Sequence, residues 1–332
     1  MRSWMGKARA GGGGGERGLD RRLAELRTAD PAFPEGLERI RNAIRATSGV
    51  LVALAVKRII EHDLAALAEQ ELVPAYQRLL ERAVQRDPAC RGKIAIARAL
   101  HELDRWEDDV FVHGVTYVQS EPAWGGSVDT AAELRGISGL AHAHFHREDV
   151  LDVLAVLLAD PERTARVAAA QGFGDAGHPD AACVLRFKLL QGDAEAEVLS
   201  ACCESLLALQ RESALGFLPR FLEDIDERAE ATALALGASR LPAALPHLER
   251  WCARCRPEQR ARVGYLALAL SRTDAGTARL LDVIGQGRGP DAVAAARALA
   301  TFKDDPSIRR QILEAAGAQH DRAARQEIEA LV

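Results

Sequence analysis

The sequence predicts an all-α protein built as a solenoid of antiparallel helix pairs, and three observations lead to this fold class. First, an acidic residue returns every 30–33 residues, at Asp160, Asp193, Asp226, Glu258, Asp291 and Asp321. Each interval is long enough for two short helices and two turns. Second, 48% of the residues are apolar and only 5% aromatic, without the Val-, Ile- and Tyr-rich alternation typical of sheets. Third, the apolar residues of each interval recur at helical spacing.

One repeat, residues 193–224, illustrates the pattern. Its predicted first helix carries one apolar stripe, formed by Leu199, Cys202, Leu206 and Leu209. Its predicted second helix carries another, formed by Leu215, Leu218, Phe221 and Leu222. Both stripes have the spacing of an amphipathic helix with one buried face. The recurring acid stands at or just before a helix start, where a carboxylate caps free N–H groups and opposes the helix dipole.

The repeats account for only part of the chain. Residues 1–18 are rich in glycine and charge and are predicted to be a disordered tail. Residues 19–86 are predicted to be helical but do not follow the repeat pattern, so we interpret them as an N-terminal cap over the end of the solenoid. The repeat domain is predicted to span 87–332, because Asp87-Pro88 is an N-cap followed by proline at the first helical position.

An insertion interrupts the first repeat. Asp87 and Asp129 are 42 residues apart, about ten more than the usual interval. A helix is predicted over 106–118, and a Thr130–Glu133 capping box predicts the start of the next one. The insertion is therefore a predicted loop at 119–128. Insertions in solenoids project from one edge and are frequently binding loops.

This loop is the predicted site of partner binding. Trp124 stands in a polar loop beside Gly125 and Gly126, and two glycines allow another backbone to approach closely. The polar neighbours predicted to take part are Glu121, Asp129, Arg135, His113 and Tyr117. A structural alternative remains open, in which Trp124 folds back as a plug between two helix pairs and the glycines only form the turn.

A second candidate is a run of arginines around one turn between repeats. It comprises Arg250, Arg254, Arg256, Arg260 and Arg262. Guanidinium groups bind phosphates and carboxylates in bidentate fashion, so the run is a possible anion-binding site. The alternative is a solvated face of an arginine-rich protein.

Metal and catalytic sites are not predicted. His142 and His146 share a helix face while His144 lies opposite, so at most two could bind one ion, and capping of a helix end explains them better. Cys252 and Cys255 lack a second ligand pair. The chain shows no nucleophile–base pair, and we expect no catalytic residue, metal or cofactor.

Charge, cysteine content and hydropathy restrict the possible environments. The net charge of −5 gives no general attraction to nucleic acid or acidic membranes. The longest apolar stretch, residues 50–56, is too short to span a bilayer. Most of the six cysteines fall on predicted apolar helix faces, which favours a reducing cytoplasm.

The segment from Asp160 to Asp175, followed by a second helix and then by Asp193, resembles a HEAT repeat of the short phycobilisome-lyase-like kind. The resemblance covers 87–332. It implies a HEAT-like superhelix, a curved scaffold whose concave face and ridges bind other proteins. The function we expect is therefore a non-enzymatic scaffold for protein–protein interaction, which binds another protein through the concave face and the loop at 119–128.

Enzymes that contain such repeats provide the alternative. HEAT-type deoxyhypusine hydroxylases use several His-Glu pairs, and this chain has only His101-Glu102. HEAT-type DNA glycosylases use Trp and Asp on a basic face, for which the loose candidates are Trp106, Asp108, Asp109 and Trp124. A bilin-lyase-like activity is implied by analogy alone. The sequence does not specify the partner, the pathway or the oligomeric state.

Overall fold

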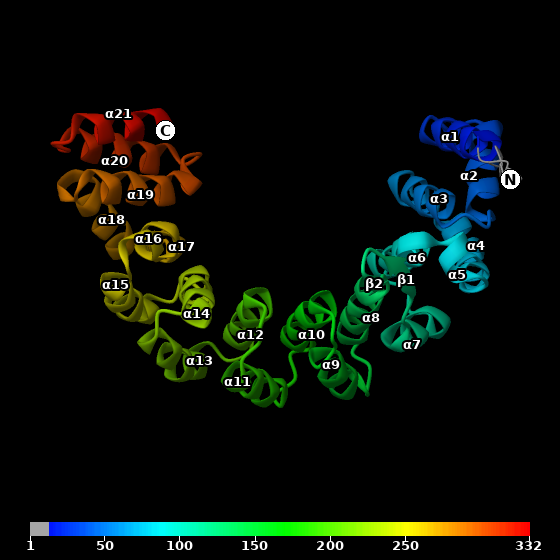
Figure 1. The fold of residues 1–332 in the computed structure, drawn as a ribbon, viewed down its shortest axis with the longest axis horizontal. Coiled ribbons are helices and arrows are strands. Elements are labelled where there is room, and N and C mark those ends of the chain that lie inside the picture. The colour runs from blue at the N-terminus through cyan, green and yellow to red at the C-terminus, as the bar shows by residue number, and fades with distance from the viewer. Residues whose placement is uncertain (1–12) are drawn as a thin grey trace, which may run out of the picture. The chain divides into compact units, whose positions relative to one another are not determined.

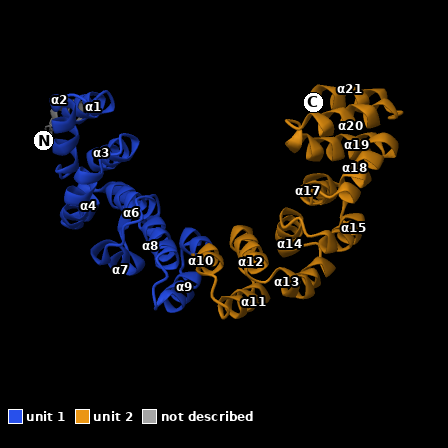
Figure 2. Cartoon of the chain, turned by 180° about the vertical axis from the view of Figure 1, so that it is seen from behind, with its two compact units in different colours: residues 1–168 blue, residues 169–332 orange. Residues whose placement is uncertain are grey.

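The computed structural model describes residues 13–332, which form about twenty helices packed in sequential pairs (Figure 1). The chain divides into two compact units, residues 1–168 and 169–332 (Figure 2). The predicted all-α class is confirmed, with one two-stranded sheet as the exception in the described residues. Residues 1–12 of the predicted disordered tail lie outside the described part. Residues 13–18 begin the first helix, so that part of the tail prediction was wrong.

The first unit contains a row of helices that pack on their neighbours, α1, α3, α6 and α8, and a second row, α2, α4 and α7. The bounds are α1 (Gly13–Arg27), α2 (Pro34–Ile44), α3 (Gly49–Glu61), α4 (Ala65–Leu80), α5 (Ala83–Arg86), η1 (Pro88–Cys90), α6 (Arg91–Glu102), α7 (Asp108–Thr116), α8 (Ala132–His144) and α9 (Val150–Leu158). Within a pair, consecutive helices pack on each other, as α2 does on α3 and α7 on α8.

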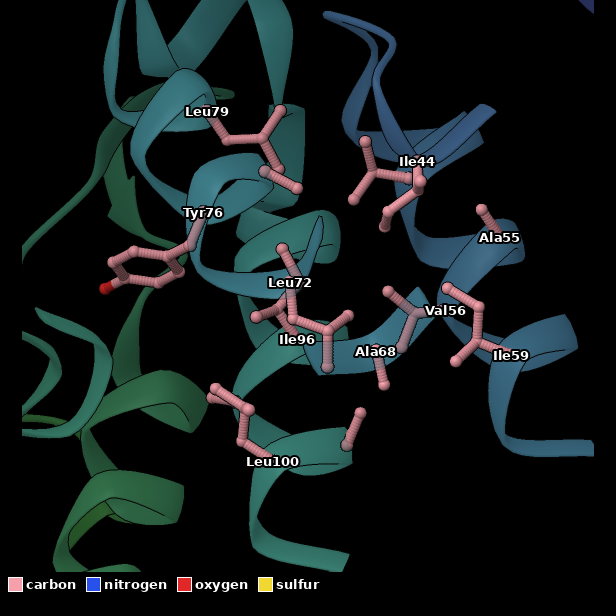
Figure 3. Close-up of a cluster of buried hydrophobic side chains, with 14 of the residues drawn as sticks. Ile44, Ala55, Val56, Ile59, Ala68, Leu72, Tyr76, Leu79, Ile96 and Leu100 are labelled. Carbon is pink, nitrogen blue, oxygen red and sulfur yellow. The ribbon is translucent and has the colours of Figure 1, made fainter. Parts of the chain in front are cut away.

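The apolar core of this unit lies between its two rows of helices. Figure 3 shows side chains from α3, α4 and α6 meeting in one cluster, among them Ile59, Leu72 and Ile96. All three are 0–1% exposed. Because α3 packs against α6, the core continues across residue 87, where the sequence placed the boundary between cap and repeats. The segment 19–86 therefore has the same paired packing as the helices that follow it.

A buried ion pair between Asp87, which precedes η1, and Lys93 of α6 lies where α6 packs against α3. The side chains of Asp87 and Lys93 are fully buried, and Lys93 Nζ lies 2.8 Å from Asp87 Oδ2. Asp87 also accepts the backbone N–H groups of Gly92 and Lys93, at 2.7 and 3.1 Å. Gly49, at the start of α3, leaves room for this carboxylate, since a Cβ at Gly49 would collide with Asp87 Oδ1.

The second unit repeats the two-row arrangement. One row contains α12, α14, α17, α19 and α21, and the other includes α18 and α20, which pack on each other. Its bounds are α11 (Ala181–Gln191), α12 (Ala196–Leu209), α13 (Arg211–Phe217), η2 (Leu218–Glu223), α14 (Glu227–Ala238), η3 (Pro242–Ala244), α15 (Leu245–Arg254), α16 (Pro257–Gln259), η4 (Arg260–Gly264), α17 (Tyr265–Leu270), α18 (Asp274–Gln286), α19 (Gly289–Leu299), η5 (Ala300–Phe302), α20 (Pro306–Gly317) and α21 (Arg322–Leu331). Helix α10 (Arg163–Ala176) spans the division between the units.

The recurring acids stand near helix starts, as predicted, but they do not all cap. Asp226 and Asp321 are N-caps whose carboxylates accept backbone N–H groups of α14 and α21. Glu258 and Asp291 instead lie inside the first turn of α16 and α19. Asp291 accepts the hydroxyl of Tyr265 at 2.9 Å, so its carboxylate joins α19 to α17 rather than capping its own helix.

None of the described helices combines the length and the apolar content that crossing a membrane requires.

Removal of the buried cation tests how much the α3–α6 junction depends on the ion pair. In Lys93→Met the Asp87 carboxylate stays buried without its counter-ion. Breaking a buried pair in this way costs about 3–5 kcal/mol. We therefore expect urea unfolding of Lys93→Met to begin at a clearly lower concentration, and Asp87→Asn added to Lys93→Met to recover part of the loss. An unchanged unfolding curve for the single variant would show that the pair contributes little.

Candidate partner-binding site

The insertion at 119–128, predicted as a loop, forms a β-hairpin between α7 and α8. Strand β1 (Ser120–Ala123) pairs antiparallel with β2 (Gly126–Asp129), and Glu121 stands opposite Val128. The two residues that join the strands are Trp124 and Gly125. Gly125 has φ +86°, a left-handed conformation that favours glycine over other residues.

The tip of the hairpin is apolar, uncharged and exposed. The relative exposure of Trp124 is 105%, so this ring contacts none of the described helices. The plug alternative for Trp124 therefore does not agree with the structure. Pro122, Ala123 and Gly126 beside it are also exposed. Nearer the base, Val128 is 46% exposed, and Val118, just before the hairpin, is 60% exposed. A large exposed aromatic side chain in an apolar surface is typical of interaction sites.

The base of the hairpin is fixed by Glu121. Its Oε1 accepts three hydrogen bonds, each 2.7 Å long, from the Ala89 backbone N–H, the Gln119 Nε2 and the Thr130 hydroxyl. Burial alone would raise the pKa of Glu121, but these hydrogen bonds and the charge of Lys93 outweigh it and hold the pKa below its usual value. The carboxylate is thus bound within the chain.

Asp129 and Arg135 form the other half of the base. Arg135 Nη1 donates to Asp129 Oδ2 at 2.6 Å and to the Tyr117 carbonyl at 3.0 Å. Its Nε and Nη2 donate to the two oxygens of Asp160, at 2.7 and 2.9 Å. Arg135 is 3% exposed, so one buried guanidinium joins the end of the hairpin to Asp160, in the turn between α9 and α10.

These contacts change the predicted role of the polar residues. Glu121, Asp129 and Arg135 were expected to orient a partner, but they are engaged inside the chain and hold the hairpin in place. The predicted Thr130–Glu133 capping box is also absent. Thr130 donates to Glu121, Glu133 pairs with Arg98, and Asp129 accepts the Ala131 N–H at 2.9 Å instead.

His113 and Tyr117 lie beside the hairpin base, with ring centroids 5.1 Å apart. The Tyr117 hydroxyl donates to Gln119 Oε1 at 3.0 Å, and His113 Nδ1 lies 3.0 Å from the Tyr76 hydroxyl. The main cause that lowers the pKa of His113 is the partial loss of water around its imidazole ring. His113 is exposed and can reach a molecule bound at this surface, whereas Tyr117 is half-buried.

The sequence analysis did not assign three residues to the base: Asp87, which it named only as an N-cap, Lys93, and Gln119, which it placed in the loop. Gln119 donates from Nε2 to the Asp87 carbonyl at 2.8 Å. A signal for two of them was present, because Lys93 follows Asp87 by six residues, as Arg135 follows Asp129. Nothing in the sequence distinguishes Gln119 from an ordinary loop glutamine.

The arginine run of the second unit is not gathered at one point. Arg262 pairs with Glu230, Arg260 donates to the Cys255 carbonyl, and Arg254 donates to the carbonyls of Leu222 and Glu223. Arg256 is exposed at the start of α16. Arg250 and Arg254 do share one surface, but with Arg220, which lies outside the run.

His142, His146, Cys252 and Cys255, which the sequence analysis had considered as metal ligands, show no sign of such a role in the described residues. His142 is buried and its Nδ1 lies 2.7 Å from the Ser138 carbonyl, while His146 follows the helix end with φ 49°. Burial raises the pKa of Cys252 to about 12 and that of Cys255 to about 11, which disfavours the reactive thiolate. Among residues 13–332, no group of three or more His, Cys, Asp or Glu has the geometry of a metal site.

Neither the models of known protein families nor the curated proteins include a match to this chain.

The lowered pKa of Glu121 predicts an acid dependence of stability. A folded pKa below the unfolded one stabilises the fold above about pH 4.3, the unfolded value, and this contribution is lost as pH falls through the folded pKa. Glu121→Gln keeps the shape but removes the charge, and we expect it to lose about 1 kcal/mol or more of unfolding free energy at pH 7.

Thermal or urea unfolding of wild type and Glu121→Gln from pH 7 to pH 3 checks this expectation. The difference between the two proteins should shrink as the pH falls below 4. Trp124→Ala provides the control, because an exposed ring should leave both the stability and its pH profile as in wild type. A constant difference at every pH would mean that the charge of Glu121 does not hold the hairpin base.

Proposed function

We propose that the chain is a non-enzymatic scaffold for protein–protein interaction and that a partner protein binds it at the tip of the hairpin. The observation that carries the proposal is the position of Trp124, fully exposed at the end of a hairpin whose base is held by buried polar bonds. Exposing an indole ring gains nothing for folding. Trp is among the residues that most often dominate binding energy at interfaces.

The chemistry of the tip favours a partner with an apolar pocket. From Pro122 to Val128 the hairpin carries no charged side chain, and its exposed residues are apolar or small. A charge-free surface around one aromatic anchor is typical of the centre of an interface. Because the buried base keeps the hairpin rigid, binding has little ordering entropy to overcome.

The proposal also covers the way in which the helix pairs are stacked. Sequential helix pairs, first-row helices that pack on one another within each unit, and acids near the helix starts all support a HEAT-like solenoid of the phycobilisome-lyase-like kind. In such a scaffold, the exposed surface of a helix row would extend the contact beyond the hairpin. A cytoplasmic location is part of the proposal and is supported by six free cysteines, five of them buried.

Truncation of the anchor is the direct test. We expect Trp124→Ala to weaken binding of the partner by about 2 kcal/mol or more, equivalent to about 30-fold or more in Kd, with an unchanged melting temperature. Phe33→Ala is the matched control, because Phe33 is also an exposed aromatic residue of the first unit, at 65%. Affinity purification with mass spectrometry identifies the partner, and titration with the purified partner gives Kd.

Several results would contradict the proposal. A partner captured equally by wild type and Trp124→Ala would place the contact elsewhere, and a lower melting temperature of Trp124→Ala would make the ring structural. Recovery of DNA that is released by salt would favour the nucleic-acid alternative, because phosphate contacts weaken steeply with ionic strength.

The glycine next to the turn provides a second test. A Cβ added at Gly126 would meet nothing within 4 Å, and the φ angle of Gly126 is one that other residues also adopt. Nothing in the unbound chain therefore requires glycine at this position. If the backbone of a partner approaches the hairpin here, Gly126→Ala should reduce binding several-fold while the stability stays unchanged. Ser127→Ala, at the next exposed position, is the control and should bind as wild type does. Equal binding by both variants would remove Gly126 from the contact.

A further inference from the structure

A second surface, independent of the hairpin, lies in the second unit between η2 and α15 (Figure 1 shows α15 and the neighbouring α13). It is an open hollow of about 480 Å³. Its polar lining consists of Arg220 and Glu223 from η2 and His247, Arg250 and Arg254 from α15. Its floor includes Trp251, which is buried and donates from Nε1 to the Asp224 carbonyl at 3.0 Å.

The three guanidinium groups of the hollow have no carboxylate partner within residues 13–332. Their hydrogen bonds to backbone carbonyls run from Arg220 Nε to Phe217 at 2.9 Å, from Arg250 Nε to Pro246 at 3.3 Å and from Arg254 to Leu222 and Glu223. Arg250 Nη2 also lies 3.5 Å from His247 Nδ1. The neighbouring Arg262, in contrast, pairs with Glu230. Three exposed cations therefore face one carboxylate, that of Glu223, on a chain whose net charge is −5.

The basic residues of α15 that line the hollow lie on one face of the helix. His247, Arg250, Trp251 and Arg254 follow one another at helical spacing and share one face, and the acid nearby in sequence, Glu249, falls on another face. Arg250 and Arg254 are one turn apart, about 6 Å along the helix axis. Alternate residues of an extended peptide are separated by a similar distance, about 6.6 Å.

We propose that this hollow binds an extended acidic peptide segment whose carboxylates stand at alternate positions, opposite Arg250, Arg254 and Arg220. A guanidinium fits a carboxylate in bidentate fashion, and the hollow is wide enough for a peptide rather than for one small anion. Pro219 and Leu222 provide apolar contacts for the peptide backbone and for the side chains between the acids.

The test uses the full chain and a fluorescein-labelled peptide of alternating glutamate and glycine, with anisotropy as the measurement. We expect binding at 50 mM salt that weakens as salt is added, and a loss of at least tenfold in affinity for Arg250→Glu and for Arg220→Glu. Arg256→Glu makes the same change of charge on an exposed residue outside the hollow, and it should remain within about twofold of wild type.

Three outcomes would overturn the assignment. Equal losses for Arg250→Glu and Arg256→Glu would mean a general charge effect rather than a site. Equal binding of a peptide of alternating glutamine and glycine would show that the carboxylates are not recognised. Full competition by inorganic phosphate at a concentration that leaves ionic strength almost unchanged would make the hollow a phosphate site instead.

A pH series supplies an independent readout. Burial, followed by the charge of Arg250, lowers the pKa of His247, so its imidazole is neutral at pH 7.5. The groups that face it are Arg220, Arg250, Arg254 and Glu223. A bound peptide carboxylate favours the protonated ring, so the affinity should rise from pH 7.5 to pH 5.5, where the carboxylates of the peptide are still ionised. His247→Gln should remove most of this rise, and an unchanged pH profile in that variant would exclude the imidazole from the hollow's binding groups.

Discussion

The first unit depends on buried or half-buried carboxylates at the starts of its helices, each neutralised by a cation six residues further on. Asp87 pairs with Lys93 in this way, and Asp129 pairs with Arg135. Arg135 also reaches Asp160, the acid of the next repeat, so the cation that neutralises one helix start also connects it to the following one. Burying one of these charged side chains without its counter-ion costs free energy, so each stabilises the fold only when the others are in place. These contacts therefore constrain how neighbouring helix pairs align, in addition to the apolar packing between them.

The hairpin is also held by carboxylates that bind backbone N–H groups at helix starts. Its two ends meet at Gln119 and Asp129, where the Gln119 N–H donates to Asp129 Oδ1 at 3.1 Å, and Glu121 and Asp129 bind groups that the helix starts present. An isolated two-stranded hairpin is marginal in water. Here the polar base supplies the stability that four-residue strands lack, and the tip is therefore free to carry an exposed indole ring.

The sequence was sufficient for the helical class and for the pairing of consecutive helices, because both follow from the apolar spacing and from the acids near helix starts. It also located the insertion, since about ten extra residues in an otherwise regular period can be counted. It did not predict that the insertion pairs with itself, because Ser120, Glu121, Pro122 and Ala123 are poor strand formers and their pairing depends on contacts with Ala89 and Asp87. Nor could it separate arginines with a carboxylate partner from those without one. Arg262 and Arg250 are alike in sequence, and only the fold places Glu230 beside the first and not the second.

The two candidate surfaces differ in the interactions that keep their residues in place. We expect this difference to affect how each surface binds a ligand. The hairpin tip is apolar and is kept in one orientation by buried charges, so binding there gains from dehydration and loses little conformational entropy. The hollow in the second unit is lined by exposed arginines that pair with no carboxylate in the described part of the chain, and water and salt weaken their attraction for an acid. A rigid apolar anchor favours slow dissociation, whereas exposed charges mainly accelerate association and select the sign of the ligand. If both surfaces serve one partner, the hairpin tip would supply most of the affinity and the hollow would supply selectivity for an acidic segment.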